Sequence, residues 1–277
     1  MPMSRKAMIA LLFWAQLGAT ALAKDPEQEL DHYLCWEITP TEFAGPKNLS
    51  LKDQFDPDKF VPATVESRSF LCNPTVKLVK YDPDNPQFPQ PLHANAHLVL
   101  YSIDQKDVSK KLNLVNQLSD KKTQTYTAVQ QRFLALPSGK KIAKGNPPKD
   151  KLPAPPPSIP TDIGHYKCYL FADLTKLPDI EGKWLLRDQL SPSEGIEITK
   201  LGPRFICNPV QKKVDDKEPT KKLYENTHLV CYALTSRHST YSDQVWIANQ
   251  FEPKGTPVLT VTGPEYLCIP STKKIVS

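Results

Sequence analysis

The feature that most constrains this fold is a pair of cysteine positions that change together. The phrase NTHLVCYAL at 226–234 closely matches NAHLVLYSI at 95–103, but Leu100 stands where the later phrase has Cys231. Further along, Ala135 likewise stands where the later copy has Cys268. The two positions are lost in the same copy, which links them to each other.

Four segments share this frame, and we call them units 1 to 4. Each has a His three residues before the first cysteine position, an Asp-Gln or Asn-Gln pair, and an aromatic residue two before the second cysteine position. The units span 32–80, 97–141, 165–214 and 228–274. The Gln precedes the second cysteine position by 18 residues in every unit, whereas 20 to 24 residues separate the His from the Gln. Each unit therefore has a variable front loop and a fixed back half.

The cysteines are predicted to form disulfides within units. Pairing between units would leave partners unpaired elsewhere when unit 2 lost both of its cysteines, whereas pairing within units leaves none. The pattern selects Cys35–Cys72, Cys168–Cys207 and Cys231–Cys268. Because the replacements in unit 2 are apolar, we expect the bridges to lie in a core, each contributing about 3–4 kcal/mol in the chain-entropy model.

The N-terminal residues predict export. Arg5 and Lys6 precede an apolar run from Ala7 to Leu17, and small residues end at Ala23, the pattern of a signal peptide over 1–23. Without Arg5 and Lys6, the 35 basic residues become 33 against 30 acidic ones, a net charge of +3. This mild charge disfavours a nucleic-acid partner. Cysteines in an exported chain favour structural disulfides, and we expect a periplasmic or extracellular protein with no later transmembrane segment.

Linker composition predicts two domains. Residues 143–162 hold seven prolines and show no apolar periodicity, which is typical of a polyproline spacer. It would separate a first duplicated domain, 25–142, from a second, 163–277. Alternation over 97–103 and β-branched runs near 245–247 and 257–261 indicate three strands per unit. In units 3 and 4, Gly202-Pro203 and Gly263-Pro264 predict a bulge or kink before the second cysteine.

The predicted fold class is all-β. Duplicated three-strand units favour two tandem small barrel- or sandwich-like domains, each with an approximate two-fold axis, because closure removes exposed strand edges. The Pro content, 28 residues against 10 Gly, agrees with short interrupted elements.

The phrase His-Leu-Val-Cys-Tyr, the Asn-Gln-Phe at 249–251 and the closing Leu-Cys-x-Pro-Ser-x-Lys at 267–273 resemble a bacterial family of secreted, duplicated, disulfide-containing domains of unknown function. The resemblance covers nearly all of 24–277 and is best in the second half. Unit 2 departs from it at Leu100 and Ala135. It implies secretion and duplication, and it carries no activity.

Two sets of repeated polar residues are candidate ligand contacts. The shared glutamines would hydrogen-bond across a domain axis and could hold a ligand there; they are Gln54, Gln117, Gln189 and Gln250. Lysines that follow each shared proline could gather as basic patches that bind anionic polysaccharide, lipopolysaccharide or phospholipid head groups. The candidate pairs are Lys140 with Lys141, Lys212 with Lys213, and Lys273 with Lys274. Simple turn-capping and solvated surface charge are the plainer interpretations.

No motif for catalysis, metal or cofactor binding emerges. His32, His97, His165 and His228 precede the cysteine positions, but His97 persists without its cysteine, so a structural role at a strand end is expected rather than a metal site. We therefore expect a non-enzymatic binding or structural module of the cell envelope or extracellular space, with an envelope protein as another partner class. The alternative is an envelope hydrolase or carbohydrate-active enzyme whose site lies in the variable loops 40–50, 104–112, 172–184 and 235–244.

Overall fold

The computed structural model describes residues 25–78, 88–119, 122–145, 147–172, 179–215, 217–236 and 241–276, so the predicted signal peptide at 1–23 lies outside the described residues. This part of the chain is all-β apart from two short 3-10 turns, η1 (Pro26–Gln28) and η2 (Gln117–Ser119). Within it, no helix has the length and apolar character needed to cross a membrane.

Each unit contains a front strand, a middle strand and a long back strand, as predicted, and unit 1 adds one short strand. The front strands are β1 (His32–Ile38), β5 (His97–Ile103), β8 (His165–Phe171) and β11 (His228–Ser236). The middle strands are β2 (Leu49–Lys52), β6 (Asp107–Val115), β9 (Asp179–Arg187) and β12 (Ser242–Asn249), with β3 (Val61–Ala63) added beside β2. The back strands are β4 (Val65–Leu78), β7 (Gln124–Ile142), β10 (Ile196–Val214) and β13 (Leu259–Ile275).

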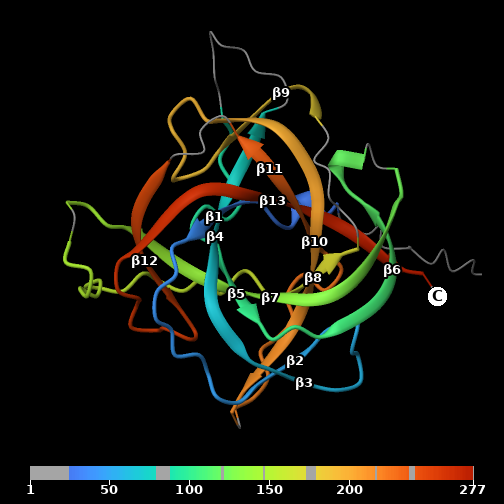
Figure 1. Cartoon of the computed structure of the whole chain (residues 1–277), viewed down its shortest axis with the longest axis horizontal. Helices are drawn as coiled ribbons and strands as arrows, with labels where there is room; N and C mark the ends of the chain where they lie inside the picture. The colour runs from blue at the N-terminus through green and yellow to red at the C-terminus, as the bar shows by residue number, and fades with distance from the viewer. Residues whose placement is uncertain are drawn as a thin grey trace, which may run out of the picture.

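Front and back strands alternate around one closed antiparallel ring, which Figure 1 shows from one end. The order is β1, β4, β5, β7, β8, β10, β11 and β13, after which β13 pairs with β1 again. Closure leaves none of these eight strands with an unpaired edge along its central part. All strands of the described residues belong to this one connected sheet.

The expectation of two tandem bodies is not confirmed, because both halves of the chain build the same ring. The seams between halves are β7–β8, where Phe133 lies opposite Cys168, and β13–β1, where Tyr266 lies opposite Cys35. Each half supplies only four ring strands, which leaves two open edges that the other half pairs. The middle strands also cross between halves: β2 pairs with β10, β9 with β4, β6 with β13, and β12 with β7.

The Pro-rich segment 143–162 is packed on this body rather than acting as a free spacer. The indole Nε1 of Trp246 donates to the carbonyl of Lys151 at 3.0 Å, and the N–H of Val258 donates to the carbonyl of Lys149 at 3.2 Å. Gly139 is required beneath this segment, because a Cβ there would lie 2.1 Å from the carbonyl oxygen of Ser158. The segment therefore crosses the surface as a strap held by both halves.

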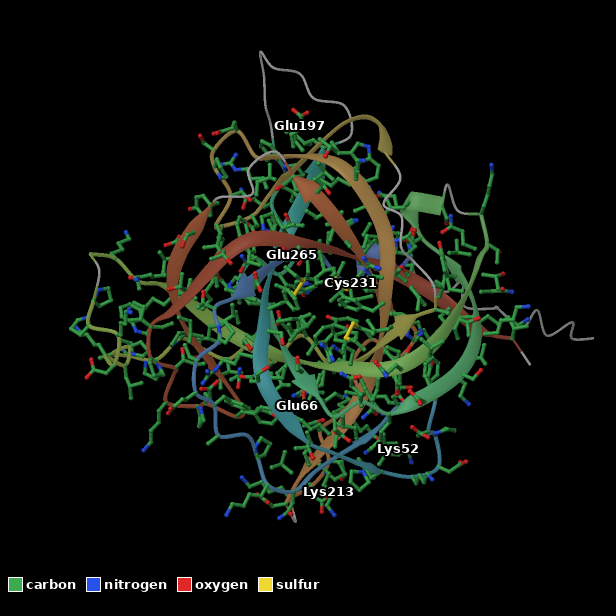
Figure 2. All side chains as sticks on the ribbon, in the orientation of Figure 1. Lys52, Glu66, Glu197, Lys213, Cys231 and Glu265 are labelled. Atoms are coloured by element: carbon green, nitrogen blue, oxygen red, sulfur yellow. A yellow bond between two sulfur atoms is a disulfide. The ribbon has the colours of Figure 1, made fainter. Side chains whose placement is uncertain are left out.

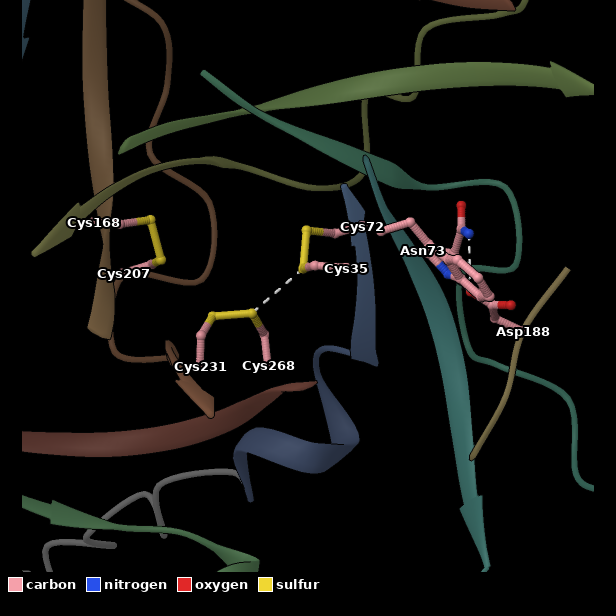
Figure 3. The surroundings of a disulfide bond; sticks show 9 residues. Cys35, Cys72, Asn73, Cys168, Asp188, Cys207, Cys231 and Cys268 are labelled. Atoms are coloured by element: carbon pink, nitrogen blue, oxygen red, sulfur yellow. Dashed lines mark hydrogen bonds between the residues drawn. A yellow bond between two sulfur atoms is a disulfide. The ribbon is translucent and has the colours of Figure 1, made fainter. Parts of the chain in front are cut away.

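The three disulfides form in the predicted pairs, and their sulfurs point into the ring (Figure 3). In unit 2, Leu100 lies directly opposite Ala135, the register that Cys35 and Cys72 have in unit 1, and both apolar side chains are almost fully buried. They fill the place of the missing bridge. The sulfurs of Cys35 and Cys268 lie only 3.7 Å apart, so neighbouring bridges touch in the core.

Four aromatic rings pack in a closed circuit next to the disulfides. Their centroids are 5.7 Å apart for Phe70 and Phe133, 5.3 Å for Phe133 and Phe205, 5.0 Å for Phe205 and Tyr266, and 5.0 Å for Tyr266 and Phe70. Neighbouring rings are inclined to each other, the arrangement that aromatic quadrupoles favour. Each ring stands two residues before a second cysteine position, so the repeated frame produces this layer.

A bulge precedes each of these aromatic residues. The register shifts between Arg68 and Phe70, between Gln131 and Phe133, and between Pro203 and Phe205, and β13 shifts near Pro264 opposite β1. The prediction from the Gly-Pro pairs of units 3 and 4 is thus confirmed, and units 1 and 2 bulge without Gly-Pro. Bulges increase local twist and bend, which suits long strands that leave a ring and continue beyond it.

A second core covers the outside of the ring. Side chains that point outward from the front strands, such as Val99 and Tyr101, are buried against the middle strands, including Leu112 and Leu114 of β6. The alternation of a β-strand sends successive side chains to the inner and outer cores. Both faces of the front strands are therefore buried, which explains the continuously apolar phrase His-Leu-Val-Cys-Tyr.

Candidate functional site

The repeated Asp residues fasten opposite units to each other. Oδ1 of Asp53 accepts the N–H groups of Phe55 and Asp56, and its Oδ2 accepts the hydroxyl of Tyr169 at 2.9 Å and the amide Nδ2 of Asn208 at 3.0 Å. The first two bonds cap a turn, as the sequence predicts. The other two join unit 1 to unit 3, and the carboxylate is buried.

Asp188 of unit 3 forms the equivalent bonds to unit 1. Its Oδ2 accepts Nε1 of Trp36 at 2.7 Å and Nδ2 of Asn73 at 2.9 Å, and Figure 3 shows Asn73 turned toward it. Oδ1 caps the following turn through the N–H groups of Leu190 and Ser191. Both carboxylates are thus fully engaged in holding the fold.

The repeated Asn residues perform the same task with donor and acceptor exchanged. Nδ2 of Asn116 donates to the hydroxyl oxygens of Tyr232 and Ser271 at 2.9 and 3.0 Å. Nδ2 of Asn249 donates to Tyr101 and Ser138 at 2.8 and 3.2 Å. Where the chain has Asp, the opposite unit supplies Asn as a donor, and where it has Asn, the opposite unit supplies Ser as an acceptor.

The first lysine of each predicted pair lies inside the molecule. Nζ of Lys140 donates to Oδ1 of Asn73 at 2.8 Å, Nζ of Lys273 donates to Oδ1 of Asn208 at 2.6 Å, and Lys212 donates to Oε1 of Gln250. Burial lowers the pKa of Lys140 and Lys212 to about 8 and that of Lys273 to about 7. These lysines therefore extend the internal network instead of forming surface patches.

The second lysine of each pair faces outward. Lys141 and Lys274 are exposed, and Lys213 is half-buried at the end of β10. Only these three of the six predicted lysines can meet a large ligand, and they come from three different units.

The four histidines lie at equivalent strand ends, each beside one of the repeated lysines. Burial, and secondarily the charge of Lys77, lowers the pKa of His32 to about 4. Burial and Lys212 lower the pKa of His165 to about 3, although its Nε2 lies 3.2 Å from Oε1 of Gln250. Burial likewise lowers the pKa values of His97 and His228. Within the described ranges, no three His, Cys, Asp or Glu side chains gather as metal ligands.

The structure does not bring the four glutamines to one site. Nε2 of Gln54 donates to the carbonyl of Glu225 at 3.2 Å, and Nε2 of Gln189 donates to that of Ala94 at 2.9 Å. Gln117 accepts from Lys77, and Gln250 accepts from Lys212. Each glutamine fastens a different linker or lysine, so no shared ligand position forms among them.

Two internal ion pairs interrupt the apolar pattern. Lys167, 2% exposed, stands where the other units have Leu34, Val99 and Val230, and its Nζ lies 3.9 Å from Oδ2 of Asp56. The guanidinium of Arg68 binds both carboxylate oxygens of Glu252, which also accepts the hydroxyl of Tyr101 at 3.0 Å. In each ion pair, a buried cation compensates the charge of an acid in the turn that follows an Asp-Gln or Asn-Gln sequence. We therefore assign a structural role to both ion pairs.

One groove gathers polar side chains that this network leaves free, and we call it the Lys213 groove. It has a volume of about 380 Å³ and is lined by 47–50, 62–64, Asp104, Lys106, Lys213 and Asp215. It forms where β2 of unit 1 pairs with the end of β10, with Lys213 opposite Ser50. In Figure 2, Lys213 lies at the rim of the molecule, far from Cys231 at the centre.

The charged groups of the Lys213 groove differ in the hydrogen bonds and ion pairs that they form within the protein. Oδ1 of Asp104 accepts the N–H of Thr64 at 2.6 Å, and its Oδ2 lies 3.1 Å from Nζ of Lys106. Oδ1 of Asp215 accepts Nδ2 of Asn48 at 3.2 Å.

Lys47 and Lys213 have no acidic partner among the described residues, and Asp215 has no cationic one there. Three lysines against two aspartates leave the groove with a net charge of +1. Lys213 was a candidate from sequence, whereas Lys47 and Lys106 were not, because they stand in variable loops outside the repeated frame. The loops 40–50 and 104–112 were nevertheless proposed as the location of a site.

The chain matches no family model, no curated protein and no solved structure. The resemblance to a secreted bacterial family thus stays a prediction.

Proposed function

We propose that this protein is an exported, non-enzymatic binding module of the cell envelope or extracellular space, built from four copies of one unit. Three buried disulfides suit an oxidising compartment such as the periplasm or the outside of the cell. We further propose that it binds anionic polysaccharide or lipopolysaccharide through the Lys213 groove.

The observation that carries this proposal is the unpaired charge of Lys47 and Lys213 in a groove built by variable loops. The repeated polar residues are used in internal bonds, which argues against a site made by the repeat itself. Lysine ammonium groups are flexible point charges suited to the sulfate, phosphate or carboxylate groups of a polymer. Such contacts are screened by salt, since the Debye length falls to about 8 Å at physiological ionic strength.

The test uses the repeat as its own control. Lys213, Lys141 and Lys274 occupy the same position in units 3, 2 and 4, but only Lys213 lines the groove. We expect the full chain to bind a sulfated heparin-type glycan at low salt and to release it as salt rises. Lys47→Ala with Lys213→Ala should weaken binding at least tenfold, which is about 1.4 kcal/mol, whereas Lys141→Ala with Lys274→Ala should change it little.

Two results would overturn the proposal: no retention of sulfated glycan, lipopolysaccharide or anionic vesicles at any salt concentration, or equal losses in both double variants. If the double variant Lys47→Ala with Lys213→Ala captured an envelope protein as well as the unchanged chain does, the binding surface would lie outside the Lys213 groove.

A glycoside hydrolase is the second candidate, and one observation favours it. Asp104 and Asp215 line the same groove, and paired carboxylates are the catalytic groups of most glycosidases. Both are already hydrogen-bonded within the protein, so we rank this function below binding. Release of reducing ends from an anionic polysaccharide, abolished separately by Asp104→Asn and by Asp215→Asn, would establish it in place of simple binding.

A further inference from the structure

A second groove, on the opposite side of the ring, has a different chemistry from the first. We call it the Arg187 groove; it has a volume of about 490 Å³ and lies between β4, the segment 88–94 and the turn after β9. In Figure 1, β9 and β2 lie on opposite sides of the ring, so the two grooves are well separated. Its size is within the range of small-ligand sites.

The groove is held open by internal bonds. Nε2 of Gln189 donates to the carbonyl of Ala94, which fastens the segment 88–94 to the turn, and the hydroxyl of Thr75 donates to the carbonyl of Arg187 at 2.8 Å. Gly195, with φ +82°, lets the following chain approach closely, because a Cβ there would lie 3.0 Å from the carbonyl oxygen of Leu186. The walls are thus formed before any ligand arrives, which lowers the entropic cost of binding.

The lining combines an apolar wall with one free cation. Pro74, Val76, Phe88, Pro89 and Pro91 supply the apolar surface. Arg187 is exposed, its guanidinium lies 5.0 Å from the centre of the Phe88 ring, and no carboxylate pairs with it among the described residues.

Asp188, the one acid in the groove lining, is not available to a ligand. Its two oxygens already accept bonds from Trp36, Asn73 and the backbone of the turn. The free charge of the groove is therefore positive. Ser191, Ser193 and the side-chain amides of Gln90 and Gln189 add hydrogen-bonding groups around it.

We infer that the Arg187 groove binds a carboxylate-bearing sugar, such as a uronic acid residue of an acidic polysaccharide. A guanidinium presents a planar fork that matches a carboxylate with two parallel hydrogen bonds. The C–H faces of a sugar ring fit an apolar wall, while its hydroxyl groups need the donors and acceptors that serine and glutamine provide. The Lys213 groove offers neither the guanidinium nor the proline wall, so this inference holds independently of the function proposed for that groove.

The experiment titrates the full chain with trigalacturonate, using isothermal calorimetry, and with maltotriose as a neutral sugar of the same length. We expect single-site binding of trigalacturonate with Kd of about 1 mM or tighter, equivalent to about −4 kcal/mol, and far weaker binding of maltotriose. Arg187→Ala should weaken trigalacturonate binding at least tenfold. Arg187→Lys should restore only part of the affinity, because an ammonium group cannot form the paired bonds.

Arg132→Ala is the matched control, since the guanidinium of Arg132 also lies over a Phe ring, that of Phe133, at 5.7 Å, but outside the groove. It should bind trigalacturonate as the unchanged protein does. Absence of binding up to about 10 mM, a limit near −2.7 kcal/mol, equal affinity for maltotriose, or equal losses in the Arg187 and Arg132 variants would overturn the inference.

The variant Lys47→Ala with Lys213→Ala separates this inference from the proposed function. It should bind trigalacturonate normally while losing the sulfated glycan. If instead it loses both ligands, the Arg187 groove is not an independent site.

Discussion

Acid should destabilise this protein strongly, because its repeated histidines are buried beside lysines. Burial lowers the pKa of His165 to about 3 and that of His32 to about 4, against about 6.5 in an unfolded chain. Between these limits the unfolded chain binds protons that the folded protein excludes. Stability is therefore fully present above pH 6.5 and is lost as pH falls toward 4.

The size of this loss follows from the pKa values. At pH 4.5, protonation lowers the free energy of the unfolded chain by about 2.7 kcal/mol for each histidine. In the folded protein His165 and His32 stay largely neutral, so the folded state gains little of this stabilisation. These two residues together remove about 5 kcal/mol, and the lowered pKa values of His97 and His228 add to the loss. Since a domain is typically stable by only about 5–15 kcal/mol, partial unfolding at pH 4.5 is expected.

Urea unfolding followed by tryptophan fluorescence at pH 7.5 and pH 4.5 measures this loss. In His165→Gln, the difference in unfolding free energy between the two pH values should be about 2.7 kcal/mol smaller than in the unchanged protein. An identical pH difference in His165→Gln and the unchanged protein would show that this histidine is not excluded from protonation by folding.

Two further predictions concern positions at which one unit departs from the others. Lys167→Leu and Asp56→Ser should each destabilise the protein by about 1–3 kcal/mol, since either breaks an ion pair between a buried lysine and a part-exposed aspartate. The double variant should recover most of that loss, because Leu34 and Ser191 occupy the equivalent positions elsewhere in the ring; additive losses in a double-mutant cycle from urea unfolding would contradict the assigned pairing. Leu100→Cys with Ala135→Cys should form a fourth disulfide, because these residues lie in the register of the other three bridges, and should raise stability by about 2–4 kcal/mol. Free thiols at both positions in non-reducing peptide mapping, or a bridge to Cys35 or Cys268, would refute the proposed equivalence.

The local frame predicted much of the inner core. The joint loss of both cysteines in unit 2, where Leu100 and Ala135 replace them, predicted the disulfide pairs. The aromatic residue two before each second cysteine position was visible in the frame, but its packing into one layer was not predicted. Capping by the Asx residues was also predictable, because an Asx side chain bonds to the backbone two and three residues onward in its own turn.

The candidate site was only partly predictable. The fate of Lys212 and Lys213 shows why: adjacent residues on a strand point to opposite sides, so one joins the internal network while the other lines a groove. Which of the two points inward depends on the strand from another unit that covers β10. Arg187 and Lys47 stand outside the repeated frame, and no local pattern marks them as free of acidic partners.

By itself, the sequence determined the strand content, the covalent bridges and the division into four units, because these depend on alternation and spacing within about 40 residues. Only the tertiary structure decided that the halves share one closed ring. Within the first half, β1 pairs with β4 and β7 pairs with β5, and the other edge of each strand is paired by a strand of the second half. That closure also decided which polar side chains were left for a ligand. It buried the repeated residues against opposite units, and it placed Lys213 and Arg187, which have no acidic partner among the described residues, in grooves where the variable loops meet the ends of the strands.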